Sequence, residues 1–244
     1  MQLYFIRHAQ SENNALWAAT GAEIGRTADP DITELGHQQA QTVARFLSQK
    51  RGYDANDWDN SRGFDFTHIY SSLMLRAVRT GTYIADAFDM PLLSWPEIHE
   101  HGGLYLDGDN GDRFGQVGPN RAFFEAHFPR LVLPDTLNHE GWWNRPYEPH
   151  EAMFPRAAQF LQALYARHGQ TDDRVALVSH GGFFQALLTA LFGLTQPGRT
   201  LGEEARWLWF RINNTSVSRI DFADDAIRVL YLNRVDFFGS DQIT

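Results

Sequence analysis

The sequence contains no cysteine among its 244 residues. Disulfide bonds, thiolate metal sites and a cysteine nucleophile are therefore excluded. The chain also lacks any apolar run close to the about 20 residues that a membrane-spanning helix needs. Its first residues have neither the basic leader nor the apolar length of a signal peptide. We expect a cytoplasmic protein with no membrane partner.

A surplus of positive charge is missing as well. The chain has 21 lysine and arginine residues against 30 aspartate and glutamate residues, which gives a formal net charge of -9. Nucleic-acid binding depends on basic residues that face phosphates, so this balance argues against a nucleic-acid partner. An anionic ligand must be attracted by a local cluster of cations rather than by the whole surface.

Strand patterns alternate with helix patterns along the chain. The predicted strands are short apolar or alternating runs at residues 3–6, 66–70, 90–98, 174–179, 207–212, 216–221 and 227–232. The predicted helices have apolar residues at helical spacing and lie at residues 11–24, 33–50, 73–88, 120–128, 151–168 and 183–192. This alternation predicts an α/β fold with three layers, α/β/α, around a mostly parallel central sheet.

The length of the chain suits one domain that spans residues 1–244. Its predicted core comprises residues 1–103 and 151–244, whereas residues 104–150 are rich in Gly, Asp, Asn and Pro and hold no long period. We interpret residues 104–150 as an inserted cap over one edge of the core. Within the sheet, the apolar run 174–179 is predicted to be central and parallel, and the prolines in 90–98 place that strand at or near an edge.

Reactive side chains follow the predicted strand ends. Arg7 and His8 come directly after the first strand, and His180 follows 174–179. Arg76 lies in the first turn of the helix after the second strand, and Glu100 follows 90–98. Because open α/β sheets bind ligands at the carboxyl ends of their strands, we expect these side chains to form one site. A guanidinium beside an imidazole indicates an anionic ligand, most simply a phosphoryl group.

Five short segments follow one another along the chain, and they contain all of these residues except Glu100. They are Arg-His-Ala-Gln-Ser-Glu-Asn-Asn at 7–14, Ile-Thr-Glu-Leu-Gly at 32–36, Ser-Ser-Leu-Met-Leu-Arg-Ala-Val-Arg-Thr at 71–80, Ser-His-Gly-Gly at 179–182 and Asn-Asn-Thr-Ser-Val at 213–217. The set resembles the motifs of the histidine phosphatase superfamily, which has the phosphoglycerate mutase-like fold. The chain departs from the family pattern at Ala9, Leu73 and Arg79, where the family has glycine, proline and glutamine.

The resemblance implies that His8 is a nucleophile that becomes phosphorylated, without a metal or another cofactor, by a small phosphorylated substrate. It further implies that the phosphoryl group is bound by Arg7, Arg76 and His180. We also count Ser11, Asn14, Thr33 and Gly181 as candidate substrate-binding residues, although the pattern favours a helix cap over a ligand for Thr33. Further candidates for the remote end of the substrate are Arg113, Arg121 and Arg145.

A glutamate is implied as the general acid. Glu100 matches the family pattern better than Glu97, which stays the alternative. Histidines 99, 101, 139 and 150 show no spacing typical of a zinc site, so no metal ligand is predicted.

Three functions are open at this point. Mutases of the family carry a Trp-Asn segment after the first histidine and a Gly-Trp loop before the helix at 33–50, whereas this chain has residues 13–15 (Asn-Asn-Ala) and 28–30 (Ala-Asp-Pro). We therefore favour a phosphatase that hydrolyses a phosphomonoester. The alternatives are a phosphoglycerate mutase-type isomerase and a non-catalytic module that binds a phosphate ligand. The oligomeric state is not indicated by the sequence.

Overall fold

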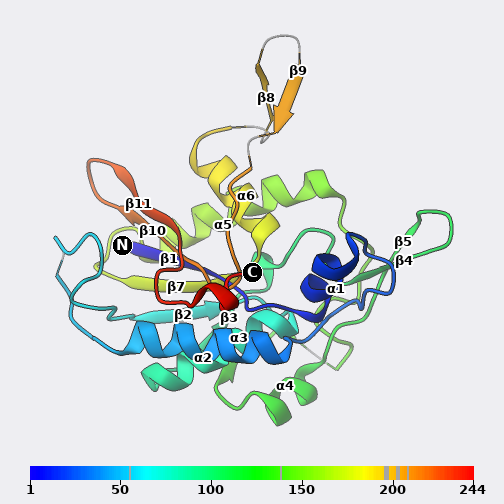
Figure 1. The fold of residues 1–244 in the computed structure, drawn as a ribbon, viewed down its shortest axis with the longest axis horizontal. Coiled ribbons are helices and arrows are strands. Elements are labelled where there is room, and N and C mark those ends of the chain that lie inside the picture. The colour runs from blue at the N-terminus through cyan, green and yellow to red at the C-terminus, as the bar shows by residue number, and fades with distance from the viewer. Residues whose placement is uncertain (55, 138, 195–197, 202–203, 208) are drawn as a thin grey trace.

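The computed structural model of the protein contains a main sheet of seven strands (Figure 1). They are β1 (Gln2–Arg7), β2 (His68–Ser71), β3 (Leu92–Ser94), β6 (Leu131–Val132), β7 (Arg174–Ser179), β10 (Val217–Phe222) and β11 (Ile227–Arg234). Their order is β11-β10-β1-β7-β2-β3-β6. The neighbouring strands in the run β1-β7-β2-β3-β6 all pair in parallel, and β10 pairs antiparallel with both β1 and β11. The mostly parallel sheet, the central place of β7 and the place of β3 near an edge confirm the predictions.

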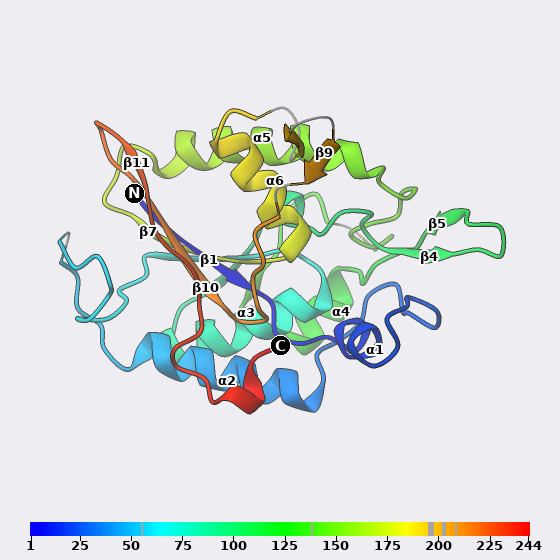
Figure 2. The same cartoon turned by 45° about the horizontal axis from the view of Figure 1, so that its top comes forward.

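Helices cover both faces of this sheet, as Figure 2 shows. One layer holds α2 (Glu34–Ser48), α3 (Leu75–Phe88) and α4 (Arg121–His127), and the other holds α5 (Met153–His168) and α6 (Gly181–Leu191). Buried side chains such as Leu47 and Ala77 fill the first interface, and Phe160 and Phe183 fill the second. The three-layer α/β/α fold is therefore confirmed.

The remaining elements lie outside the main sheet and its two layers. They are α1 (Glu12–Thr20), the hairpin β4 (Tyr105–Asp107) and β5 (Arg113–Gly115), the hairpin β8 (Gly198–Leu201) and β9 (Glu204–Trp207), and the 3-10 turns η1 (Pro96–Ile98), η2 (His150–Ala152) and η3 (Ser240–Gln242). The structure describes all residues except 55, 138, 195–197, 202–203 and 208, and only the backbone of 198–201 and 204–207. No helix in this described part is long and apolar enough to cross a membrane.

Residues 104–150 contribute to the core as well as to its surroundings. Strand β6 lies within this segment and pairs with β3, with Leu92 opposite Leu131. Phe124 and Phe128 are almost completely buried in the hydrophobic cluster that also contains residues of α3. The hairpin of β4 and β5 instead extends away from the sheet (Figure 2). The segment thus combines an edge strand with a projecting hairpin.

Two predicted elements are shorter than expected. The helix predicted at 11–24 ends at Thr20, because Gly21 adopts a left-handed φ of 65° and its N–H bonds to Trp17 O. The strand predicted at 90–98 is limited to Leu92–Ser94. Pro96 has no N–H to donate to a neighbouring strand, and it begins η1 instead.

The prediction of a strand at 207–212 is wrong. Strand β9 ends at Trp207, residue 208 lies outside the described residues, and 209–212 form no strand. The side chain of Gln185 binds both backbone groups of Phe210, with Phe210 N donating over 2.9 Å and Phe210 O accepting over 2.6 Å. Arg7 Nη1 donates to Ile212 O over 2.6 Å. Because side chains satisfy these backbone groups, the alternating pattern needs no partner strand.

Candidate active site

The carboxyl ends of the parallel strands bring the two predicted histidines together. Strands β1 and β7 are in register with Arg7 opposite Ser179, so the residue after each strand falls at the same level. These residues are His8 and His180, whose ring centres lie 5.0 Å apart with an interplanar angle of 54°. The convergence expected from the strand ends is therefore present.

The hydrogen bonds of His8 define which of its ring nitrogens is unprotonated. Nδ1 lies 2.7 Å from Ala9 O, a carbonyl that can only accept, so Nδ1 carries the proton. Arg76 Nε donates to Nε2 over 3.2 Å, which requires a lone pair on Nε2. Burial of the ring, followed by the charges of Arg76 and Arg7, holds the pKa of His8 well below 6.5. The ring is thus neutral, and its Nε2, beside the Arg76 guanidinium, has the lone pair that a nucleophile needs.

His180 is fully buried and is oriented by Ser72. Ser72 Oγ lies 2.7 Å from His180 Nε2 and also accepts a bond from Met74 N. No bond from this hydroxyl to another acceptor is found among the described residues, so we assign its proton to the bond with Nε2. This arrangement leaves the proton of His180 on Nδ1, which has no hydrogen-bond partner among the described residues. Burial, followed by the charges of Arg76 and His8, lowers the pKa of His180 well below 6.5. His180 therefore offers an unused N–H donor.

Arg7 supplies the second unused donor of the site. Its Nη1 bonds to Ile212 O, whereas its Nε is buried and makes no hydrogen bond within the described part of the chain. Burial lowers the pKa of Arg7 to about 10, so the guanidinium is still charged at neutral pH. Buried polar groups without partners are rare in proteins. An anion with several acceptor oxygens would satisfy both donors.

A cavity of about 180 Å³ opens over His8. The predicted site residues that line it are Arg7, His8, Ser11, Asn14, Arg76 and Glu100. His180 does not line this cavity. Gly181 lines a neighbouring cavity of about 300 Å³, which shares Arg7 and Glu100 with the first. The two cavities thus gather all the predicted residues except His180 and Thr33.

Thr33 lines neither cavity. Its Oγ1 accepts a bond from Gly36 N over 3.0 Å and donates to Gln10 Oε1 over 2.7 Å. Thr33 is the N-cap of α2, and its hydroxyl proton is used in the bond to Gln10. This geometry gives it a structural role and does not support the substrate contact that we expected.

Ser11 and Asn14 hold each other at the start of α1. Ser11 Oγ accepts from Asn14 N, and Asn14 Oδ1 accepts from Ser11 N, which forms a capping box. Asn14 Oδ1 also accepts from Asn214 Nδ2 over 3.1 Å, and the same Nδ2 donates to His8 O over 2.9 Å. Asn214, for which we predicted no role, thus ties the last loop of the motif set to the His8 backbone.

The two candidate acids differ in their surroundings. Glu97 is exposed and does not line the cavity, whereas Glu100 lines it. Glu100 Oε1 and Oε2 accept bonds from Phe183 N and Gly182 N at the start of α6, over 3.0 and 2.9 Å. Burial raises the pKa of Glu100, but these bonds and the neighbouring His101 lower it well below 4.5. Without a ligand, Glu100 is therefore a carboxylate.

One cation of the cavity was not found from the sequence. Arg26 lies in the loop between α1 and α2, and its guanidinium stacks 3.9 Å above the ring of Tyr105. Arg26 Nη1 is buried, makes no hydrogen bond within the described residues and lies 3.8 Å from Glu23 Oε2. The cap arginines, which we considered for the remote end of a substrate, do not line the cavity: Arg113, Arg121 and Arg145.

A comparison with known families agrees with this geometry. A model described as the histidine phosphatase superfamily (branch 1) matches residues 3–235. The chain belongs to this superfamily. A Hydrogenobacter thermophilus protein provisionally named phosphoserine phosphatase 2 is 28% identical over 236 residues, which cover 96% of each chain. The 2,3-bisphosphoglycerate-dependent phosphoglycerate mutase 1 of Latilactobacillus sakei is 28% identical over 78% of this chain and 79% of its own.

Solved structures of the superfamily share the fold. The phosphoserine phosphatase of Entamoeba histolytica, in complex with 3-phosphoglyceric acid, superposes with a TM-score of 0.56 and 20% identity. The match covers 97% of this chain and 98% of that one. A mycobacterial glucosyl-3-phosphoglycerate phosphatase gives a TM-score of 0.58 with 19% identity, over 96% and 99% of the two chains. The phosphoglycerate mutase-like fold is therefore shown.

Proposed function

We propose that this superfamily member is a phosphatase that hydrolyses a small phosphomonoester through a phosphohistidine on His8. The observation that carries this proposal is the unprotonated Nε2 of His8, whose lone pair accepts a hydrogen bond from Arg76 Nε in the free protein. A bound phosphoryl group would take the place of this bond. The buried and unpartnered Arg7 Nε supports the proposal, because a guanidinium that lines the cavity can donate to the oxygens of a phosphoryl group. His180 Nδ1 is also unpartnered, and its ring lies against that of His8. Phosphoryl transfer depends mainly on such positioning and charge stabilisation.

The proposed reaction has two steps. His8 Nε2 attacks phosphorus while the bond from phosphorus to the ester oxygen breaks, and Glu100 gives a proton to the leaving oxygen. A water molecule then attacks the phosphohistidine, and Glu100 takes the proton of this water as the bond to Nε2 breaks. The products are an alcohol and inorganic phosphate, and His8 returns to its starting tautomer.

Glu100 must gain a proton before it can act as an acid. In the free protein its carboxylate is held by the first N–H groups of α6. A phosphate bound next to Glu100 adds negative charge, which raises the pKa of the carboxyl group. The proton of a bound phosphate monoanion can therefore pass to Glu100 within the complex. His101, whose Nδ1 lies 3.2 Å from Glu100 Oε1, is a second source of a proton.

The function is tested by measuring phosphate release from a panel of phosphorylated metabolites without added metal. Release of phosphate from at least one small phosphomonoester is expected. The mutase relative makes phosphoryl transfer between phosphoglycerates the second candidate. A protein that equilibrates two phosphoglycerates and releases almost no free phosphate would be an isomerase. A protein that binds phosphate but turns over neither class of substrate would be a binding module.

Glu100→Gln should slow the hydrolysis of alkyl phosphates about 10²- to 10⁴-fold, because their leaving groups need a proton. A phenolic ester such as p-nitrophenyl phosphate should be affected much less in the first step. Glu97→Gln is the matched control, since Glu97 lies nearby in the sequence but is exposed and outside the cavity. An inactive Glu97→Gln beside a normal Glu100→Gln would transfer the role to Glu97.

The activity should persist at mildly acidic pH. A histidine with the ordinary pKa of about 6.5 would lose its lone pair between about pH 7.5 and 5.5. Burial and the charges of Arg76 and Arg7 lower the pKa of His8 well below that value, so its neutral form stays dominant across this range. We expect kcat/KM for phosphate release to show no loss over this range. A titration with an apparent pKa near 6.5 that removes activity on the acid side would contradict this prediction.

Arg26 should select substrates that carry a second anionic group. Phosphoserine and 3-phosphoglyceric acid, which are bound by the Entamoeba histolytica enzyme, each carry a carboxylate. Because a hydrogen bond to a charged group contributes about 1.5–3 kcal/mol, Arg26→Ala should raise KM for such substrates about 10- to 100-fold. The KM for p-nitrophenyl phosphate should hardly change. Arg113→Ala is the matched control, because Arg113 also stacks on Tyr105 but does not line the cavity.

A further inference from the structure

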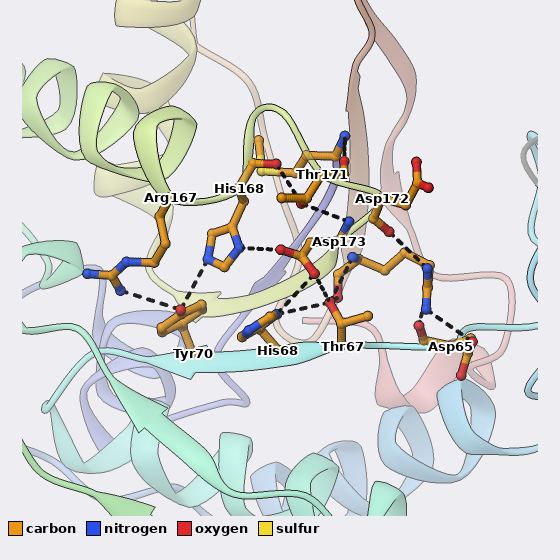
Figure 3. Close-up of polar contacts among 11 residues, drawn as sticks. Asp65, Thr67, His68, Tyr70, Arg167, His168, Thr171, Asp172 and Asp173 are labelled. Carbon is orange, nitrogen blue, oxygen red and sulfur yellow. Dashed lines mark hydrogen bonds and ion pairs between the residues drawn. The ribbon is translucent and has the colours of Figure 1, made fainter.

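A cluster of His68, His168 and Asp173 lies far from the proposed catalytic residues. His68 begins β2, His168 ends α5 and Asp173 directly precedes β7. The cluster is thus at the amino ends of β2 and β7, whereas His8 and His180 lie at the carboxyl edge of the sheet. Figure 3 shows both imidazoles directed toward the carboxylate of Asp173. We propose that these three residues form a binding site for a divalent transition-metal ion such as Zn²⁺.

The distances are close to those that a metal requires. His168 Nδ1 lies 2.8 Å from Asp173 Oδ2, and His68 Nδ1 lies 3.6 Å from Asp173 Oδ1. The ligand atoms of all three residues lie within 4.8 Å of one another. Two ligands of a tetrahedral zinc ion, each at about 2.1 Å, are about 3.4 Å apart. Shifts of about an ångström or less at each side chain would therefore complete the geometry.

The far side of the His168 ring is already held. Its Nε2 lies 3.1 Å from the Tyr70 hydroxyl, and Arg167 Nη1 lies 3.4 Å from the same oxygen (Figure 3). His168 is only 2% exposed, so its ring is fixed in one orientation. Metal-binding histidines characteristically use their second nitrogen in this way, which orients the ligating nitrogen. When Nδ1 binds the metal, the Tyr70 hydroxyl can accept a hydrogen bond from the protonated Nε2 of His168.

The charges of the cluster suit a cation. Burial raises the pKa of Asp173, but its hydrogen bonds, first that from His168, lower it to about 2, so the carboxylate is ionised at neutral pH. As the metal binds Nδ1 of His168, the imidazole changes tautomer, so that its proton lies on Nε2 and faces the Tyr70 hydroxyl. The nearby cation Arg174 is paired with Asp65 at 3.2 Å, which reduces its repulsion.

The ligand set indicates the class of metal. Two imidazoles and one carboxylate favour Zn²⁺, Co²⁺ or Ni²⁺ over Mg²⁺ and Ca²⁺, which prefer oxygen ligands throughout. The Thr67 hydroxyl lies 2.9 Å from His68 Nδ1 and 3.2 Å from Asp173 Oδ1, so a fourth position can be filled by this hydroxyl or by water. His68 is one-third exposed and gives access from solvent. A bound ion would join β2, α5 and the start of β7.

The experiment measures Zn²⁺ bound per chain by equilibrium dialysis of the chelator-treated full chain. We expect His68→Ala and Asp173→Asn each to lose one ion, whereas the exposed control His127→Ala loses none. Tyr70→Phe should keep the site but weaken it about 10- to 100-fold, as loss of an orienting partner does. Counting ions per chain separates this site from zinc held by the histidines near His8.

Thermal unfolding gives a second readout, because a ligand that binds only the folded chain raises Tm. Zn²⁺ should raise Tm of the wild type and of His127→Ala, and this shift should be absent in His68→Ala. Equal zinc content and equal shifts in all three proteins, or no zinc binding at all, would overturn the proposal and leave a plain hydrogen-bond network. Phosphate release is expected to continue in His68→Ala, so the outcome is independent of the proposed phosphatase reaction.

Discussion

His8→Ala should reduce phosphate release to the uncatalysed background. Removal of the nucleophile from a covalent hydrolase costs on the order of 10⁶ in kcat. The other imidazole among the described residues that line the cavity belongs to His101, whose Nδ1 is held 3.2 Å from Glu100 Oε1. His180 is the nearest imidazole, at 5.0 Å between ring centres, but it does not line the cavity and its Nε2 is bound to Ser72. We therefore expect no rescue by the second histidine.

The intermediate can be tested directly with a substrate labelled in its phosphoryl group. The wild type should retain label after rapid denaturation at alkaline pH, where the bond between phosphorus and nitrogen survives, and His8→Ala should retain none. His127→Ala, which removes an exposed imidazole on α4, should be labelled like the wild type. Label on His8→Ala would place the nucleophile on another residue.

Arg76→Ala should have the next largest effect. Arg76 Nε donates to His8 Nε2 in the free protein, and its guanidinium lines the cavity in which phosphoryl charge develops. Loss of such a donor costs about 2–4 kcal/mol of transition-state stabilisation, which corresponds to roughly 30- to 900-fold in kcat/KM. The charge of Arg76 also lowers the pKa of His8, so its removal should move the acidic limit of activity to higher pH.

One further variant separates the charge of Arg76 from its geometry, and a second serves as a control. Arg76→Lys keeps the charge but loses the planar guanidinium, so it should restore the pH limit more fully than it restores the rate. Arg45→Ala removes an exposed arginine from α2 and should behave as the wild type. If Arg76→Ala lost less than about fivefold in kcat/KM, an effect under about 1 kcal/mol, Arg76 would not stabilise the transferred group.

The sequence allowed the convergence at His8 to be predicted because each residue follows a regular element. The strand before His8 and the strand before His180 are short, apolar and parallel, and parallel strands place their ends at one edge. The start of α3 is fixed by the end of β2, which places Arg76 at the same edge. Family motifs then gave the order of the segments, and the residues matched by the superfamily span most of the chain.

Other parts of the site could not be predicted because tertiary packing decides them. Arg26 lies in an irregular loop, and its position depends on Tyr105, a residue far along the chain. His68 and His168 are also distant in sequence, and no short motif joins them to Asp173. The segment 209–212 has the alternation of a strand, but Gln185 and Arg7 bind its backbone instead. Local periodicity carries no information about such distant partners.

The place of β6 in the sheet limits how the substrate preference of this protein can be redesigned. Grafting the whole of 104–150 from a relative would exchange Tyr105 at the cavity, but it would also replace the outermost strand beside β3 and the buried Phe124 and Phe128. Such chimeras would trade new selectivity for a damaged scaffold. Among the described residues of 104–150, Tyr105 alone lines the cavity, so substitutions at this position can alter the cavity while β6 and both phenylalanines stay in place.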